Sequence, residues 1–224
     1  MKNILLLVAL GFALIGCEST EDNYHVQGNT VIGEGVGLEG FSFEVPTGYK
    51  VYQEGVVART DLINAADQIT DNFYGGGYAP YKIILFSDYE VLVLTPLSFS
   101  ARPGYRRISD MHFQAMPNSF SLMNREDKIA LLQNMVSSVS VHGENFKDVQ
   151  TYVDTEGEIP VSVFSCNMDI SPTVYLPVSC VDRLGDLREI YSIYSIADPM
   201  SFEKGRDDSI KLARSINLDP PAGK

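Results

Sequence analysis

Hydrophobic and polar residues alternate strictly over residues 41–45, which read Phe-Ser-Phe-Glu-Val. This alternation predicts a β-strand with one buried face. A Pro-Thr-Gly turn follows at 46–48, and residues 49–53 predict the return strand of a hairpin. By this pattern the folded part of the chain begins with a hairpin.

Two nearly continuous apolar runs, at 81–86 and 91–95, flank the polar residues 87–90. Such runs predict a hairpin at the centre of a sheet, covered on both faces. Residues 98–124 predict a long irregular segment, and loops of that length are often functional. Further strands are predicted at 146–153, 159–165, 173–179 and 187–196.

Three segments carry apolar side chains at helical spacing, three and four residues apart. The first begins after Thr60, a residue that caps helices, and stops at the glycines 75–77. The second begins after Asn124, and the third covers about 201 or 206 to 216. The apolar stripes of the first two consist of Leu62, Ala65, Ala66, Ile69 and Phe73, and of Ile129, Leu132, Met135, Val136 and Val139.

Hairpins separated by helices predict an α+β fold, with a mainly antiparallel sheet and two or three helices packed on it. The chain has no internal repeat and no break in composition after residue 40. We therefore expect a single domain over 41–218 and a tail at 219–224.

The first seventeen residues have the pattern of a secretion signal. Lys2 precedes an uncharged run at 4–15, which is shorter than the roughly 20 residues that cross a membrane as a helix. Residues 14–17, Leu-Ile-Gly-Cys, resemble the lipobox of bacterial lipoproteins. The resemblance implies that the signal peptide 1–16 is removed and that Cys17 is lipidated. Two or more acyl chains anchor a protein stably. The alternatives are an uncleaved amino-terminal helix and a buried start of the domain.

The same resemblance implies a location in the cell envelope, with the membrane contacted through the lipid. In Gram-negative lipoproteins, Asp after the lipidated Cys often causes retention in the inner membrane. This chain has Glu18 there, which favours the periplasmic face of the outer membrane. Residues 17–40 are polar, acidic and glycine-rich, so we expect a lipidated Cys followed by a flexible tether.

Composition and charge narrow the class of partner. The chain is 45% hydrophobic and 10% aromatic, which is enough to bury a core. Its net charge is −12 at pH 7, and it has no basic stripe. An acidic surface repels phosphate backbones, so we expect no nucleic-acid partner.

Two cysteines, Cys166 and Cys180, are left after Cys17 is assigned to the lipid. Outside the cytoplasm such a pair is typical of a disulfide. The predicted strands place them at adjacent ends of the 159–165 and 173–179 pair, which suits a structural staple.

A cationic cluster in the long loop is the candidate anion-binding site: Arg102, Tyr105, Arg106, Arg107 and His112. Guanidinium groups recognise carboxylates and phosphates, so the hypothesis is an anionic partner such as a glycan, a lipid headgroup or an acidic protein. The alternative is a surface loop whose arginines pair with the protein's own acids.

No other motif indicates a reaction. A G-x-G-x-x-G at 35–40 precedes a strand and not a helix, so we expect no dinucleotide cofactor. His25, His112 and His142 lack the spacing of metal ligands, and we expect no metal. The 29 acidic residues permit a glycosidase-like pair somewhere but do not indicate which, so no catalytic residue is assigned.

Residues 40–49, GFSFEVPTGY, resemble the opening strand and turn of PsbP-like domains. The segment 214–216, Arg-Ser-Ile, is similar to their close. This resemblance implies an α/β/α sandwich and an accessory or binding role. The function expected from the sequence is thus a membrane-anchored envelope lipoprotein that binds or scaffolds. The alternatives are an envelope hydrolase acting on glycan or peptide, and a carrier of an apolar ligand.

Overall fold

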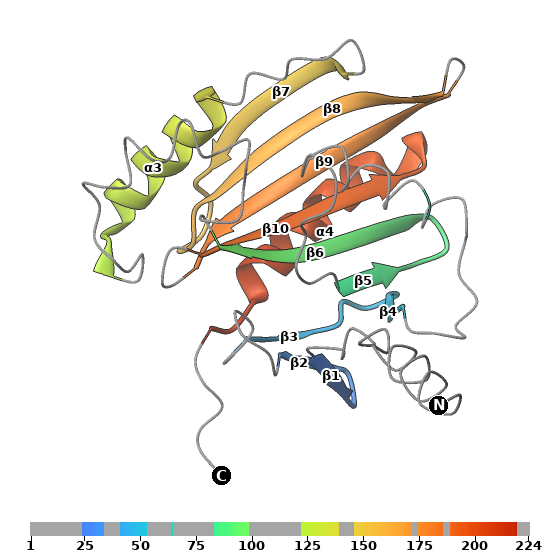
Figure 1. Ribbon diagram of the computed structural model, residues 1–224, viewed down its shortest axis with the longest axis horizontal. Helices are drawn as coiled ribbons and strands as arrows, with labels where there is room; N and C mark the ends of the chain where they lie inside the picture. Colours follow the sequence, from blue (N-terminus) through green and yellow to red (C-terminus); the bar gives the residue numbers. More distant parts are fainter. Residues whose placement is uncertain are drawn as a thin grey trace, which may run out of the picture.

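An antiparallel sheet is the centre of the structure, a computed structural model of the chain (Figure 1). Seven strands among the described residues form it, in the order β4-β5-β6-β10-β9-β8-β7. Their bounds are β4 Lys50–Val51, β5 Ile83–Phe86, β6 Glu90–Ser98, β7 Phe146–Asp154, β8 Val161–Ser171, β9 Val174–Leu184 and β10 Glu189–Ala197. The structure describes residues 24–33, 41–52, 64, 83–98, 122–138, 146–171, 174–185 and 189–218.

Two helices among the described residues pack on this sheet, α3 (Arg125–Ser138) and α4 (Phe202–Ser215), with the short 3-10 helix η3 (Pro199–Ser201) before α4. The predicted α+β fold, a mainly antiparallel sheet carrying helices, is confirmed. The predicted second and third helices correspond to α3 and α4. The predicted first helix, apart from Asn64, and most of the 98–124 loop lie outside the described residues.

A second, three-stranded sheet lies partly within residues 17–40, where the sequence predicted a flexible tether. β1 (Tyr24–Gln27) and β2 (Thr30–Gly33) form a hairpin inside the 17–40 segment, and β2 pairs with β3 (Ser42–Glu44). The hairpin folds because Val31 is fully buried in the main core, opposite Phe43. The sequence did not predict this hairpin, because most residues of the 17–40 segment are polar or glycine.

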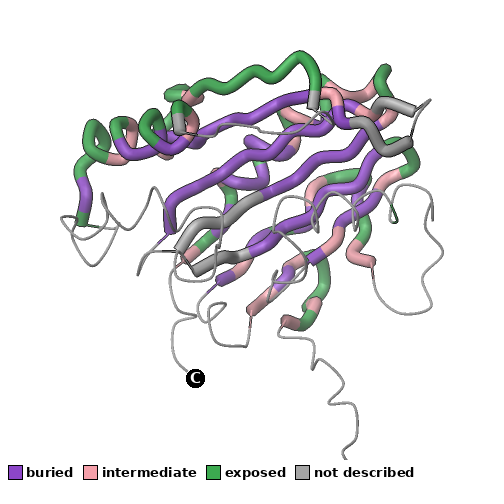
Figure 2. The backbone as a smooth tube through the Cα atoms, turned by 45° about the horizontal axis from the view of Figure 1, so that its top comes forward, coloured by how far each residue is buried: buried purple, intermediate pink, exposed green. Residues whose placement is uncertain are grey.

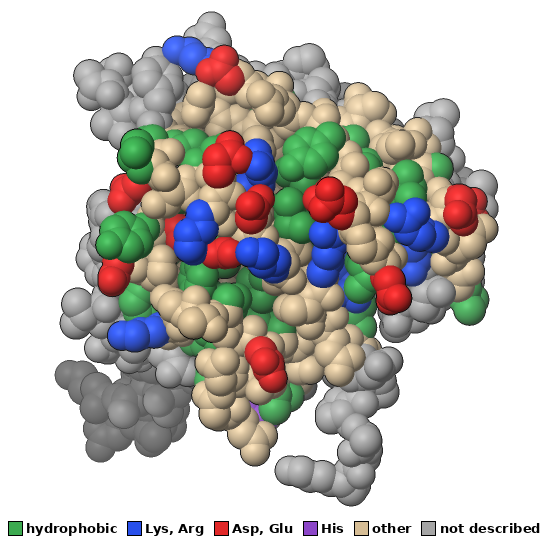
Figure 3. Space-filling model, turned by 180° about the vertical axis from the view of Figure 1, so that it is seen from behind, with side chains coloured by type: hydrophobic (Ala, Val, Ile, Leu, Met, Phe, Trp, Pro, Cys, Tyr) green, Lys and Arg blue, Asp and Glu red, His purple; other side chains and the backbone are tan. Residues whose placement is uncertain are grey.

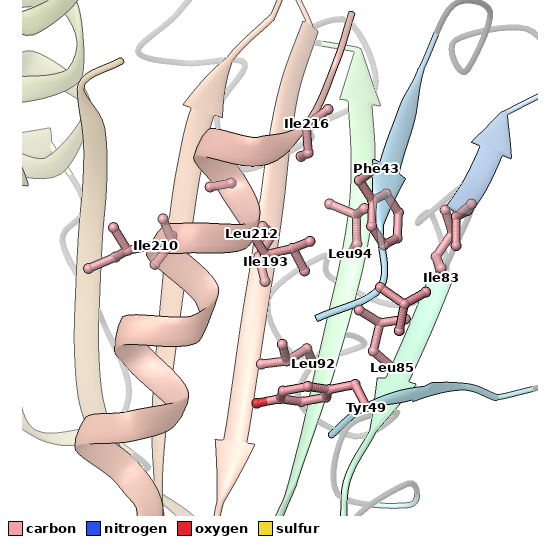
Figure 4. Packing of buried hydrophobic residues seen from close by; sticks show 14 of the residues in the cluster. Phe43, Tyr49, Ile83, Leu85, Leu92, Leu94, Ile193, Ile210, Leu212 and Ile216 are labelled. Carbon is pink, nitrogen blue, oxygen red and sulfur yellow. The ribbon is translucent and has the colours of Figure 1, made fainter. Parts of the chain in front are cut away.

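One aliphatic row runs across five strands of the main sheet and forms its core. Its members lie directly opposite one another and are all fully buried: Val163, Val181, Ile193, Leu94 and Ile83. Figure 4 shows Ile193 and Leu94 lying close to Leu212 of α4 and Phe43 of β3. Burial is greatest along these central strands, whereas the edge strand β7 is largely exposed (Figure 2).

α4 approaches the sheet closely because small residues face it. Ser165, Ser179 and Ser195 lie opposite one another on β8, β9 and β10, next to the aliphatic row. Gly205 and Ser209 of α4 are buried, and a Cβ at Gly205 would meet the Oγ of Ser195 at 2.5 Å. Real Cβ atoms do not come that close. Gly205 thus sets the distance between α4 and β10.

α3 covers the opposite face at the other end of the sheet. Asn124 caps it, as predicted, since its Oδ1 accepts a hydrogen bond from the Asp127 backbone N–H at 2.8 Å. Its buried side chains pack on Leu184 of β9 and Val153 of β7. They are Leu131, Leu132 and Met135, so Leu131 joins the predicted stripe. No helix among the described residues is long and apolar enough to span a membrane.

Replacing Gly205 with Ala is expected to destabilise the protein by about 1–3 kcal/mol, the usual cost of overpacking a core. The sign is the test, because Gly to Ala within a helix normally stabilises by roughly 0.5–1 kcal/mol. The measurement is the free energy of unfolding in urea. Lys211→Ala, on the exposed side of α4, is the control and should change it by less than about 0.5 kcal/mol. A more stable Gly205→Ala variant would contradict the close approach of α4.

Candidate functional site

The residues singled out by sequence lie mostly beyond the described part of the chain. Cys17 and the candidate anion-binding residues Arg102, Tyr105, Arg106, Arg107 and His112 all fall outside the described residues. The described residues contain a different cationic site and a buried polar cluster, and they contain no group of three or more potential metal ligands.

Cys166 and Cys180 lie within β8 and β9 and not at their ends, because both strands extend further than predicted. Cys166 is opposite Val178 and Cys180 is opposite Phe164, so the two cysteines are diagonal neighbours. Diagonal residues are roughly 7–8 Å apart, whereas a disulfide joins Cα atoms about 4.4–6.8 Å apart. Both cysteines are buried and neither forms a disulfide among the described residues, so the disulfide stays a prediction.

Burial also makes the thiol of Cys166 unreactive. Loss of hydration raises the pKa of its thiol to about 12. A thiol that stays protonated is a poor nucleophile and a poor metal ligand. Cys166 therefore acts as a core residue.

A hollow of about 140 Å³ lies between the start of α3, the turn from β7 to β8 and the end of β9. We call it the α3 hollow. Four charged and four apolar residues line it: Arg125, Lys128, Glu158 and Arg183, with Met123, Ile159, Pro160 and Leu184. Three cations face one acid here, in a chain whose net charge is −12. The net charge of the lining residues is thus opposite in sign to that of the whole protein.

Arg183 is held rigidly in the wall of the α3 hollow. Its side chain is 9% exposed, and its Nη1 donates hydrogen bonds to the backbone oxygens of Ala213, at 2.9 Å, and Ile216. These carbonyls end α4 and lack partners within the helix. Arg183 therefore both lines the α3 hollow and caps α4.

One arginine from each helix donates hydrogen bonds to the turn from β7 to β8. Nη2 of Arg125 donates to the backbone oxygen of Thr155 at 2.6 Å. From the α4 side, Arg214 donates to the backbone oxygen of Ile159 at 3.1 Å and to Asp154 Oδ1 at 2.7 Å. The walls of the α3 hollow are consequently fixed relative to both helices.

Lys128 carries a charge that is not paired with any other described residue. Among the described residues, neither its Nζ nor the carboxylate of Glu158 has a hydrogen bond or an ion pair, although both line the α3 hollow. An ammonium on a flexible stem in this setting has three donors to offer a ligand.

A second group of polar side chains, which we call the Tyr49 cluster, lies beneath the start of α4. It consists of Tyr49, Glu90, Lys204 and Asp208. Glu90, at the start of β6, is 1% exposed and contacts the hydroxyl of Tyr49. Lys204 of α4 lies 2.9 Å from Glu90 Oε1 and 2.5 Å from Asp208 Oδ2. The Tyr49 hydroxyl is also 3.0 Å from Asp208 Oδ2. Around this cluster, acidic and basic side chains alternate on the α4 side of the molecule (Figure 3).

Burial raises the pKa of Glu90, and the hydrogen bond from Lys204 opposes this rise only in part. The Tyr49 hydroxyl lies against both Glu90 and Asp208, so these two carboxylates share one donor. The other Glu90 oxygen, Oε2, is buried and has no hydrogen-bond partner among the described residues. Burial and this shortage of donors both favour the protonated form of Glu90.

No family model matches the chain, and a search of the curated proteins finds no match either.

Sequence reasoning assigned these residues to ordinary structural positions. Glu90 was one of four polar residues in a predicted turn, and Arg125 and Lys128 stood in the first turn of a predicted helix. Arg183 lies beyond the end of the predicted strand 173–179, so the sequence did not indicate that its charge would be buried. No spacing rule connects β9 with the start of α3, so the α3 hollow could be recognised only from the three-dimensional structure.

Glu90→Gln is expected to remove a pH dependence of stability. The folded state holds the Glu90 proton more tightly than the unfolded state, whose pKa is near 4.5. Wild-type stability from this group is therefore present below pH 4.5 and lost as the pH rises through the raised pKa. In urea unfolding between about pH 4 and pH 8, the stability of the variant relative to wild type should rise with pH.

Tyr49→Phe is the control for this measurement, because it leaves Glu90 titratable and should keep a pH-dependent profile. Parallel curves for wild type and Glu90→Gln over the whole range would contradict the raised pKa of Glu90.

Proposed function

We propose that this protein is a membrane-anchored bacterial envelope lipoprotein whose folded body binds an anionic partner and does not catalyse a reaction. The observation that carries the binding part is the α3 hollow, with its cationic lining on an acidic protein. The lipobox-like residues 14–17 support the anchoring part.

The short connection from anchor to body supports a function close to the bilayer. If Cys17 carries the lipid, six residues separate it from β1, which begins at Tyr24. Fully extended, seven residue steps span at most about 25 Å. A body held at that distance meets membrane-associated partners at high effective concentration.

The chemistry of the α3 hollow favours binding over catalysis. Arginine stays protonated at all physiological pH values, so Arg125 and Arg183 attract an anion but do not transfer protons. The likeness of residues 40–49 and 214–216 to PsbP-like domains fits this reading, since those domains mostly act as accessory or binding modules.

The hydrolase alternative has one observation in its favour, the raised pKa of Glu90 beside Lys204 and Asp208. A general acid must reach its substrate, and Glu90 is 1% exposed beneath α4. We therefore assign the Tyr49 cluster to the fold. The carrier alternative gains nothing from the α3 hollow, because pockets for drug-sized ligands measure about 300–1,000 Å³.

Cys17→Ser is expected to move the protein from the membrane fraction to the soluble fraction of the envelope and to abolish labelling by a radioactive fatty acid. The reason is that the serine hydroxyl cannot form the thioether to the lipid. Cys166→Ser makes the same substitution at a buried cysteine and should leave both readouts unchanged. Membrane association of an unlabelled Cys17→Ser protein would refute the anchor.

A further inference from the structure

We propose that the α3 hollow binds a carboxylate carrying a short apolar group, as found in a short aliphatic acid or at the apolar C-terminus of a peptide. This rests on the proposed function in that the body is taken to be a binding module. It goes further by naming the chemical class of the ligand.

Size sets the first limit. The hollow measures about 140 Å³, and a water molecule takes about 30 Å³ in the liquid. The space therefore holds a carboxylate and a few carbon atoms, so only the end of a larger ligand fits inside it.

The lining sets the second limit, since half of it is apolar. Met123, Ile159, Pro160 and Leu184 offer no hydrogen-bond donor from their side chains to an anion. A free phosphate turned toward them would leave oxygens without partners, which is costly. A carboxylate joined to an aliphatic group can place its charge against the cationic side chains and its carbons against the apolar ones.

The charged lining residues favour a ligand with a single negative charge. Lys128 offers three N–H donors, and Arg125 keeps donors beyond the Nη2 that holds the turn. Glu158 lines the same space and repels a dianion more than a monoanion. If the ligand is a peptide, the Glu158 carboxylate can accept a hydrogen bond from a backbone N–H of that peptide.

The test uses the full lipidated chain in detergent micelles and titrates probes by saturation-transfer NMR. The first pair is butyrate and butyramide, and the second is an acetylated dipeptide ending in valine and its amide. Inorganic phosphate is the fifth probe. We expect saturable binding of at least one of the two carboxylates and none of the amides or of phosphate. Which carboxylate binds more tightly identifies the source as a free acid or a peptide end.

Variants locate the binding in the hollow. Lys128→Ala should weaken carboxylate binding about tenfold, since it removes a charge-assisted hydrogen bond. Lys128→Arg should retain binding, and Lys211→Ala, on the exposed side of α4, should bind as wild type. Glu158→Gln should admit phosphate. Thermal melting checks that each variant is folded.

The proposal is overturned if neither carboxylate binds, if acid and amide bind equally, if phosphate binds wild type as tightly as the carboxylate, or if Lys128→Ala binds as wild type. Membrane fractionation of Lys128→Ala separates this result from the anchoring proposal. A variant that loses the carboxylate and stays in the membrane fraction leaves the anchor intact.

Discussion

The close approach of α4 to the main sheet is the constraint on which the rest of the structure depends. Gly205 of α4 lies against Ser195 of the serine row on β8, β9 and β10, and the small side chains of this row let the helix approach. Dispersion contacts increase as the helix approaches, and Leu212 of α4 packs in the same core as Ile193. Polar contacts at the two ends of α4 add to this packing. Lys204 reaches Glu90 at the first turn, and Arg183 holds the last carbonyls.

The contacts at the last turn of α4 also build the α3 hollow. Arg183 caps α4 and lines the hollow, while Arg214 holds Ile159, whose side chain forms another part of the wall. A shift of α4 along the sheet would move Arg214 and the carbonyls that hold Arg183, and would so reshape the hollow. Arg125 links the same turn to α3. Both helices, which lie on opposite faces of the sheet, thus set the dimensions of a single site.

Much of the fold followed from local pattern. Alternation at 41–45 and the apolar runs at 81–86 and 91–95 predicted strands because each run packs against a core on a known face. Asn124 predicted the start of α3 from its own capping hydrogen bond. The β1–β2 hairpin was missed, because its burial rests on Val31 and its pairing on β3. Glu90 and Arg183 were missed as site residues for the same reason, since their partners come from α4, more than 25 residues away.

The buried charge of Glu90 follows from the small-residue interface. A carboxylate under a helix costs hydration energy, and an apolar side chain of similar size would avoid that cost. An apolar side chain would make no directional contact with α4, whereas Glu90 contacts both Lys204 of α4 and Tyr49. In this position of α4, Arg214 lies beside the turn of the α3 hollow. Burial raises the pKa of Glu90, which favours protonation and so lowers the cost of burying this side chain.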